Sequence, residues 1–324
     1  MLITNDIVRN VTGAEIEHFR QYGFVLLKRM IAPCALKRLD AAIEEAIATI
    51  STSAAHCDLT QLAEAAMRHA RTEVEKCANG EGPFSPAVLG DALRRSAARP
   101  LEEIPKAGAP RGHSLIDQFV SERVPALRKF ALHDDLPRLA AAFLDIRAVR
   151  FFDDILCVRQ AGAIERTAFH QDLSYLHLDG DRGCSFWMFL DPAREGAGAL
   201  GYVPGSHRWG HLFKPNFLIS EIACPGSEGT ELPNIESEPE AFGVQYIETE
   251  PGDIVAHHFL TVHGKQGNRS PHPCRSFALR YVDAQTRIRR RPGLGMPPVY
   301  RRPMCDGDLL DNRIHPLAWS APMG

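Results

Sequence analysis

The 324-residue chain lacks several features that would assign it to other protein classes. Its eight cysteines form no CxxC or other close pair, which argues against a zinc ribbon and against a dense disulfide framework. No apolar run approaches the roughly 18 residues needed to span a bilayer, and the N-terminus has no basic segment followed by an apolar one. These absences predict a cytoplasmic protein with reduced thiols and no membrane partner.

The chain also has little net charge and few lysines. Its 37 basic and 40 acidic side chains give a formal charge of -3, and only seven of the basic residues are lysine. A chain without excess positive charge has no general attraction to polyphosphate, so nucleic acid is not an expected partner. With 44% hydrophobic residues, the length suits one large domain or two small ones. We expect a single domain spanning 1–324.

Histidine, by contrast, is abundant and clustered. The sequence contains 14 histidines, and nine of them lie between His170 and His315. Because histidine is the commonest metal ligand in proteins, this clustering is the first indication of a metal site.

The hydrophobic pattern divides the chain near residue 149. Helical spacing predicts helices at 12–22 and 35–50 on either side of a strand at 24–27. The sequence from 58 to 144 is also predicted to be helical. From 149 to 285, short β-branched or aromatic runs alternate with turn residues, which is typical of a sandwich, barrel or jelly roll. We therefore expect a mainly β core at 149–285, with flanking helices mostly in 1–148 and a C-terminal tail at 286–324 that closes the pocket.

Four His-x-Asp pairs occur, and residues two apart on a strand project to the same side. They are His56/Asp58, His133/Asp135, His170/Asp172 and His177/Asp179. The first two pairs precede predicted helices, so Asp58 and the Asp134-Asp135 dipeptide are interpreted as helix caps. Asp179 is part of Leu178-Asp179-Gly180-Asp181, a sequence typical of a turn. Only His170-Gln171-Asp172 lies inside a strand-like run.

Five motifs in order now resemble a known family. TAFHQDLSYL, CSFWMFLDP, GALGYVPGSH, GDIVAHHFLTVHG and CRSFALRYV resemble the phytanoyl-CoA dioxygenase-like branch of the iron(II)/2-oxoglutarate-dependent oxygenases, as does the opening TGAEIEHFRQYGFVLLKRMI. The resemblance runs from about residue 12 to 285. It implies a double-stranded β-helix, that is, a cupin-like jelly roll. The stretch 51–115 does not match closely, and we expect it to be a substrate-facing insertion.

The resemblance implies a metal site of three residues. His170 and Asp172 would be the proximal iron ligands, and His263, 93 residues after the first, the distal one. Two histidines and one carboxylate leave coordination positions open for co-substrate and oxygen. His257 is an even number of residues from His263 on the predicted strand, so both point to the same side. His257 is therefore a candidate hydrogen-bond partner of a metal ligand, although a histidine buried in the core with its hydrogen bonds satisfied is the commoner case.

The co-substrate 2-oxoglutarate needs a cation for its distal carboxylate, and a guanidinium offers two parallel hydrogen bonds. Arg275, twelve residues after His263, occupies the family's position. Arg280 is the competitor, because the two arginines are five apart and lie on opposite strand faces. Thr167 and Trp187 stand where related enzymes line the co-substrate.

The family chemistry uses Fe(II), 2-oxoglutarate and O2, and it releases succinate and CO2. The presence of Asp172 favours hydroxylation of an unactivated carbon over halogenation, because related halogenases have a small residue there. Desaturation, cyclisation and epimerisation use the same ligands and stay open. Two alternatives differ more: a non-catalytic metal-binding jelly roll, and an oxygenase in which a chelating substrate replaces 2-oxoglutarate.

The substrate is expected to be a small organic molecule or natural product. The one basic cluster reads as a solvated face by default, but it could hold a CoA nucleotide or an acidic carrier protein. It consists of Arg287, Arg289, Arg290, Arg291, Arg301 and Arg302. The sequence gives no indication of the oligomeric state.

Overall fold

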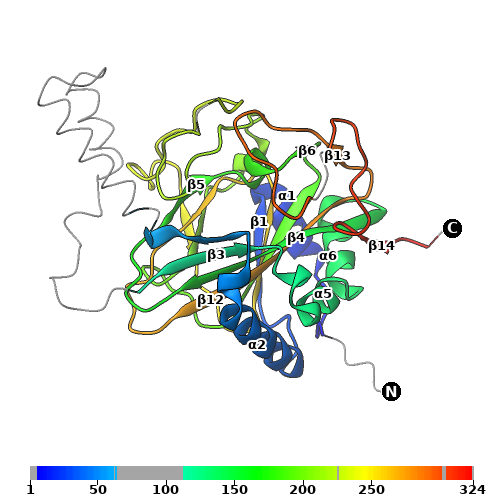
Figure 1. Cartoon of the computed structure of the whole chain (residues 1–324), viewed down its shortest axis with the longest axis horizontal. Coiled ribbons are helices and arrows are strands. Elements are labelled where there is room, and N and C mark those ends of the chain that lie inside the picture. The colour runs from blue at the N-terminus through cyan, green and yellow to red at the C-terminus, as the bar shows by residue number, and fades with distance from the viewer. Residues whose placement is uncertain (1–5, 62, 64–111, 225, 301–303, 323–324) are drawn as a thin grey trace, which may run out of the picture.

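The computed structural model describes residues 6–61, 63, 112–224, 226–300 and 304–322. Most of the predicted insertion at 51–115 lies outside these residues. Two antiparallel sheets make up the core, with helices packed against the larger sheet (Figure 1). No helix in the described ranges has the length and apolar character to cross a bilayer. The jelly roll predicted from the sequence is confirmed.

The larger sheet has eight strands. Along its path lie β1 (Phe24–Leu27), β10 (Ile254–His258), β7 (Gly183–Phe189), β12 (Cys274–Asp283), β4 (Ala148–Arg159), β3 (Ser114–Gln118) and β2 (His56–Asp58), with β14 (Leu317–Ser320) beside β4. The smaller sheet contains β5 (Thr167–His170), β11 (His263–Lys265), β8 (Leu200–Tyr202) and β9 (Gln245–Ile247). Separately, β6 (Leu178–Asp179) pairs with β13 (Arg287–Ile288).

Four α-helices have both ends within the described residues, all before residue 149. They are α1 (Gly13–Tyr22), α2 (Pro33–Ala48), α5 (Pro125–Ala131) and α6 (Asp135–Leu144). Short 3-10 turns are η1 (Ile50–Thr52), η2 (Val120–Glu122), η3 (Asp172–Tyr175) and η4 (Ser206–Arg208). The predicted start and end of α1 are confirmed: Thr12 and Glu15 form a reciprocal capping box, and Gly23 ends the helix with φ of +83°.

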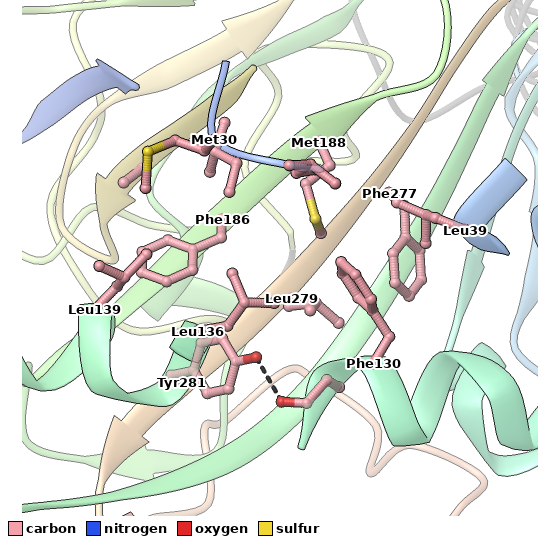
Figure 2. Packing of buried hydrophobic residues seen from close by; sticks show 14 of the residues in the cluster. Met30, Leu39, Phe130, Leu136, Leu139, Phe186, Met188, Phe277, Leu279 and Tyr281 are labelled. Atoms are coloured by element: carbon pink, nitrogen blue, oxygen red, sulfur yellow. Dashed lines mark hydrogen bonds between the residues drawn. The ribbon is translucent and has the colours of Figure 1, made fainter. Parts of the chain in front are cut away.

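Strand alternation gives the larger sheet two different faces. On β12, Phe277, Leu279 and Tyr281 pack against the helices, and Tyr281 donates a 2.7 Å hydrogen bond to the carbonyl of Ala131 (Figure 2). Cys274 and Ala278, which point to the opposite side of β12, belong to the cluster between the two sheets. The functional site lies on this inner face.

The β core draws on more of the chain than 149–285. Strands β1, β2 and β3 come from the first 148 residues and extend the larger sheet. β1 matches the strand predicted at 24–27, whereas β3 lies inside the stretch 58–144, for which the sequence predicts helix. The strand pairing of β2 and β3 depends on the distant β4, so short-range periodicity does not reveal it.

The three other His-x-Asp pairs have structural roles. Asp58 caps as predicted, accepting hydrogen bonds from the N–H groups of Thr60 and Gln61. Asp134 precedes α6 but makes no capping hydrogen bond, so that part of the prediction is wrong. Asp179 is exposed and lies in β6 rather than in a turn.

Candidate metal centre and co-substrate pocket

Three buried side chains converge between the two sheets. His170 ends β5, Asp172 begins η3, and His263 begins β11, where it lies directly across from His170. The Nε2 atoms of both histidines are 3.8 Å from Oδ1 of Asp172. One ligand atom from each residue lies within 4.8 Å of the others, a spacing that could hold one metal ion.

Backbone carbonyls fix the orientation of both histidines. Nδ1 of His170 is 2.8 Å from the carbonyl of Ala168, and Nδ1 of His263 is 2.9 Å from that of Thr261. Because a carbonyl can only accept, Nδ1 of each ring carries the proton and donates. In the neutral ring, Nε2 then presents its lone pair to the centre, as a metal ligand must.

A hydrogen-bonded chain orients the carboxylate of Asp172. Its Oδ2 accepts from the Ser185 hydroxyl at 2.6 Å and from Nε2 of His257 at 3.2 Å. Since the carboxylate only accepts, Nδ1 of His257 accepts in turn from the Tyr202 hydroxyl at 2.9 Å. These contacts hold Oδ2 in place and leave Oδ1 facing the two histidines. His257, the candidate partner of the sequence analysis, lies in direct contact with Asp172.

The charges at this centre suit metal binding. Burial alone would raise the pKa of Asp172, but His170, His257, His263 and Arg280 hold it well below the usual value. Burial lowers the pKa of His263, and the neighbouring His257 and His170 lower it further. The aspartate is therefore ionised and His263 neutral at ordinary pH, the protonation states that metal coordination requires.

A second group of buried polar side chains lies beside the three residues. Lys265 follows His263 by two positions on β11 and pairs with Thr167, while Ser276 and Trp187 come from β12 and β7. The ammonium of Lys265 donates to the Ser276 hydroxyl at 2.5 Å and lies 5.1 Å from the Trp187 ring centroid. Arg159, at the end of β4, donates to the Thr167 hydroxyl at 2.7 Å.

With this geometry established, comparison with known proteins identifies the family. The family model described as "Phytanoyl-CoA dioxygenase (PhyH)" matches residues 19–276, which is most of the chain. The chain belongs to the phytanoyl-CoA dioxygenase family. It is thus an iron- and 2-oxoglutarate-dependent oxygenase by family. No curated protein matches it by sequence.

Solved structures of similar fold include several oxygenases. The 2-oxoglutarate-dependent carbocyclase SnoK from nogalamycin biosynthesis has a TM-score of 0.63 at 18% identity, covering 95% of this chain and 96% of its own. The epimerase SnoN, solved with Fe3+, 2-oxoglutarate and nogalamycin RO, has a TM-score of 0.61 at 17% identity, covering 94% and 98%. EctD from S. alaskensis, solved with 2-oxoglutarate and 5-hydroxyectoine, has a TM-score of 0.54 at 16% identity, covering 99% of this chain and 90% of its own.

The structure places the predicted co-substrate arginine away from the metal centre. Arg275 lies on the outer face of β12, where its guanidinium binds Asp191 at 2.8 Å and also reaches Asp40 and Glu44 of α2. Hydrogen bonding to Asp191 raises the pKa of Arg275. The structure does not bring Arg275 to the metal centre, because strand parity directs it toward the helices.

Arg280, the competitor, lies on the inner face but is already paired. Its Nε and one terminal nitrogen each bind a carboxylate oxygen of Asp153 at 2.5 Å. The other terminal nitrogen is 3.8 Å from Oδ1 of Asp172. The guanidinium of Arg280 is therefore neutralised by Asp153 and lies beside the metal ligand Asp172. It is not free to bind the carboxylate of a co-substrate.

Thr167 and Trp187, the other predicted co-substrate residues, do lie beside the centre, together with three residues that the sequence analysis missed. Lys265, Ser276 and Arg159 are buried on the inner surface of the jelly roll. A signal existed for one of them, since Lys265 shares strand parity with His263. The orphaned Nε1 of Trp187 and the two buried cations fit a dicarboxylate co-substrate.

The basic cluster is only partly a solvated face. Arg291 is buried and binds Glu228 and the carbonyls of Leu176 and Leu178. Arg289 also pairs with Glu228, at 3.0 Å. Arg301 and Arg302 lie outside the described residues. Where they are described, the cluster's guanidiniums are largely engaged within the protein, which does not favour a dedicated CoA or carrier site.

Proposed function

We propose that His170, Asp172 and His263 hold one iron(II) ion, with which the protein oxidises a small organic or natural-product substrate. The observation that carries the proposal is the convergence of two Nε2 atoms and one carboxylate oxygen. A hydrogen bond at the other polar atom of each side chain holds it in this orientation. Two histidines and one carboxylate on one side of a metal are the ligand set of non-haem iron oxygenases.

The reaction that we propose is hydroxylation of an unactivated carbon, with succinate and CO2 formed from 2-oxoglutarate. When bound, iron supplies the activation of oxygen. The protein's own residues fix the ligands, bury the centre and exclude water, so that the oxidant meets the substrate and not a side chain. The intact Asp172 supports hydroxylation over halogenation, because the carboxylate fills the position that a halide would need.

Desaturation, cyclisation or epimerisation is the second candidate. The carbocyclase and the epimerase of similar fold make this outcome worth separate measurement. Product mass distinguishes three groups: a hydroxylated product gains one oxygen atom, a desaturated or cyclised product loses two hydrogens, and an epimerised product keeps its mass. The NMR spectrum of the product then separates a new double bond from a new ring. Substrate panels should contain small acids and natural-product scaffolds, free and linked to CoA.

The iron site is tested by a matched pair of variants. Asp172→Ala should lower iron stoichiometry measured by metal analysis and reduce succinate release by on the order of 1000-fold, because it removes one of three ligands. Asp179→Ala changes the aspartate of another His-x-Asp pair, exposed on β6, and should leave both measurements unchanged. Equal succinate release from Asp172→Ala and the wild type would refute the proposed site.

A further inference from the structure

The buried ammonium of Lys265 is the most unusual feature of the inner face. Lys265 is only 4% exposed, and it hydrogen-bonds the Ser276 hydroxyl and the Cys157 side chain. The described part of the chain places no carboxylate within 4 Å of Nζ. A buried positive charge is costly without an opposite charge, so this position calls for an anion.

A second buried cation adds to the same positive region. Arg159 is fully buried, and its terminal nitrogens donate to Ser114, the carbonyl of Glu165 and Thr167, all neutral groups. Its Nε has no partner among the described atoms. Burial alone would raise the pKa of the Cys157 thiol, but the charges of Lys265 and Arg159 bring it below its usual value.

The place of Lys265 relative to the metal centre suggests which anion belongs there. His263 pairs with His170, and Lys265 pairs with Thr167 further along the same two strands. Residues two apart on a strand are separated by roughly 6.6 Å and point to the same side. A five-carbon diacid that chelates a metal at the histidine pair would therefore extend its far carboxylate toward Lys265 and Thr167.

We infer that Lys265 binds the distal carboxylate of 2-oxoglutarate, in place of an arginine on β12. This inference rests on the proposed function. Ser276 positions the ammonium, Arg159 adds a second positive charge through Thr167, and the Phe189 and Trp187 rings form an apolar wall, with their centroids 5.2 and 5.1 Å from Nζ. The indole N–H of Trp187, buried without a partner, is a further donor for the ligand.

Anaerobic calorimetry of the iron(II)-loaded protein tests the inference without turnover. The wild type should bind 2-oxoglutarate much more tightly than 2-oxobutyrate, which keeps the chelating end and lacks the distal carboxylate. Lys265→Met should weaken 2-oxoglutarate binding on the order of 100-fold and bind the two compounds alike, because a buried charge-assisted hydrogen bond is lost. The upward shift in Tm that 2-oxoglutarate causes in the wild type should largely disappear.

Three variants serve as controls. Lys265→Arg keeps the charge and should recover part of the affinity. Arg275→Gln should bind 2-oxoglutarate like the wild type, because Arg275 faces the helices. Cys157→Ser should bind 2-oxoglutarate with nearly wild-type affinity, whereas a large gain in affinity would mean that a Cys157 thiolate already neutralises Lys265 and would overturn the inference.

The outcomes separate this inference from the proposed function. If the wild type binds iron and 2-oxoglutarate but does not discriminate against 2-oxobutyrate, the role of Lys265 is refuted and the oxygenase site stands. The same holds if Lys265→Met binds 2-oxoglutarate as tightly as the wild type. If the iron-loaded wild type binds neither compound, both proposals fail. The comparison of ligands on the wild type decides the matter even if Lys265→Met does not fold.

Discussion

Both faces of the larger sheet are buried, but the inner face adds a group of charged and polar side chains to its apolar ones. The face toward the helices is apolar, with Phe277, Leu279 and Tyr281 on β12 packed into one cluster. The inner face of the same strand has Ser276 and Arg280, and the same side of the sheet has a lysine and three histidines from β5, β10 and β11. Burial therefore does not distinguish structure from function here. A buried charge without an opposite charge does distinguish them. An apolar cluster needs no further partner, whereas the buried ammonium of Lys265 needs an anion.

The first prediction breaks the apolar face. Phe277→Ala should lower the free energy of unfolding by about 3–5 kcal/mol, because it removes a fully buried ring and leaves a cavity. Urea denaturation measures the loss, and Phe277→Leu should cost much less since it keeps most of the volume. Iron stoichiometry of the folded fraction should not change. A loss of iron at unchanged stability would show that the two faces are not separable.

Much of the fold follows from local sequence signals. Helices α1 and α2 and strand β1 come from capping residues, apolar spacing and a terminal glycine, all of which act over a few residues. Strands β2 and β3 are short; β3 pairs with the distant β4 and β2 pairs with β3, so their own residues carry little information. The helical prediction for 58–144 is therefore wrong at β3, where tertiary contacts determine the structure, and right at α5 and α6.

The site shows the same limit at single residues. The motif order correctly groups His170, Asp172 and His263, and alternation correctly separates Arg275 from Arg280. Which face of β12 is inside cannot be read from the strand, because nearly every residue of β12 is buried and no polar alternation marks one side. Lys265 is found only when the parity of His263 is extended by two residues.

The second prediction compares adjacent aspartates on opposite faces of β4. Asp153 faces Arg280, whereas Asp154 accepts hydrogen bonds from the backbone N–H groups of Val120 and Ser121 and has no ion-pair partner among the described residues. Burial raises the pKa of Asp154 to about 7. In the unfolded chain an aspartate titrates near ~3.9, so between these values the folded state retains a proton that the unfolded chain releases.

This contribution to stability is fully present below about pH 4 and declines as the pH rises to about 7. Between pH 5 and 8 the wild type should lose on the order of 2 kcal/mol for this reason, and Asp154→Asn should abolish that part of the decline. Chemical denaturation at both pH values measures it. An identical pH dependence in the two proteins would show that Asp154 is ionised in the folded state.

The third prediction concerns the chain from Tyr202 through His257 to Asp172. His257→Phe should weaken iron binding by about 10–100-fold, because partners behind metal ligands orient them. Tyr202→Phe removes only the outer link and should have a smaller effect. Metal competition titration measures the affinity, and His257→Gln, which keeps a donor for Asp172, should restore part of it. If His257→Phe lowers stability but leaves iron affinity unchanged, His257 contributes to core packing and does not orient Asp172.

The smallest effect is expected on the outer face, at Arg275. Arg275→Gln removes a partly exposed ion-pair network that joins β12 to α2 and should cost about 1 kcal/mol, less at high salt. Arg194→Gln, in a more exposed pair with Glu250, is the control and should cost less than half of that. The variants of Arg275 and Lys265 then give opposite results. Arg275→Gln lowers stability and leaves 2-oxoglutarate binding intact, whereas Lys265→Met weakens 2-oxoglutarate binding. A loss of 2-oxoglutarate binding in Arg275→Gln would instead place the co-substrate cation on β12.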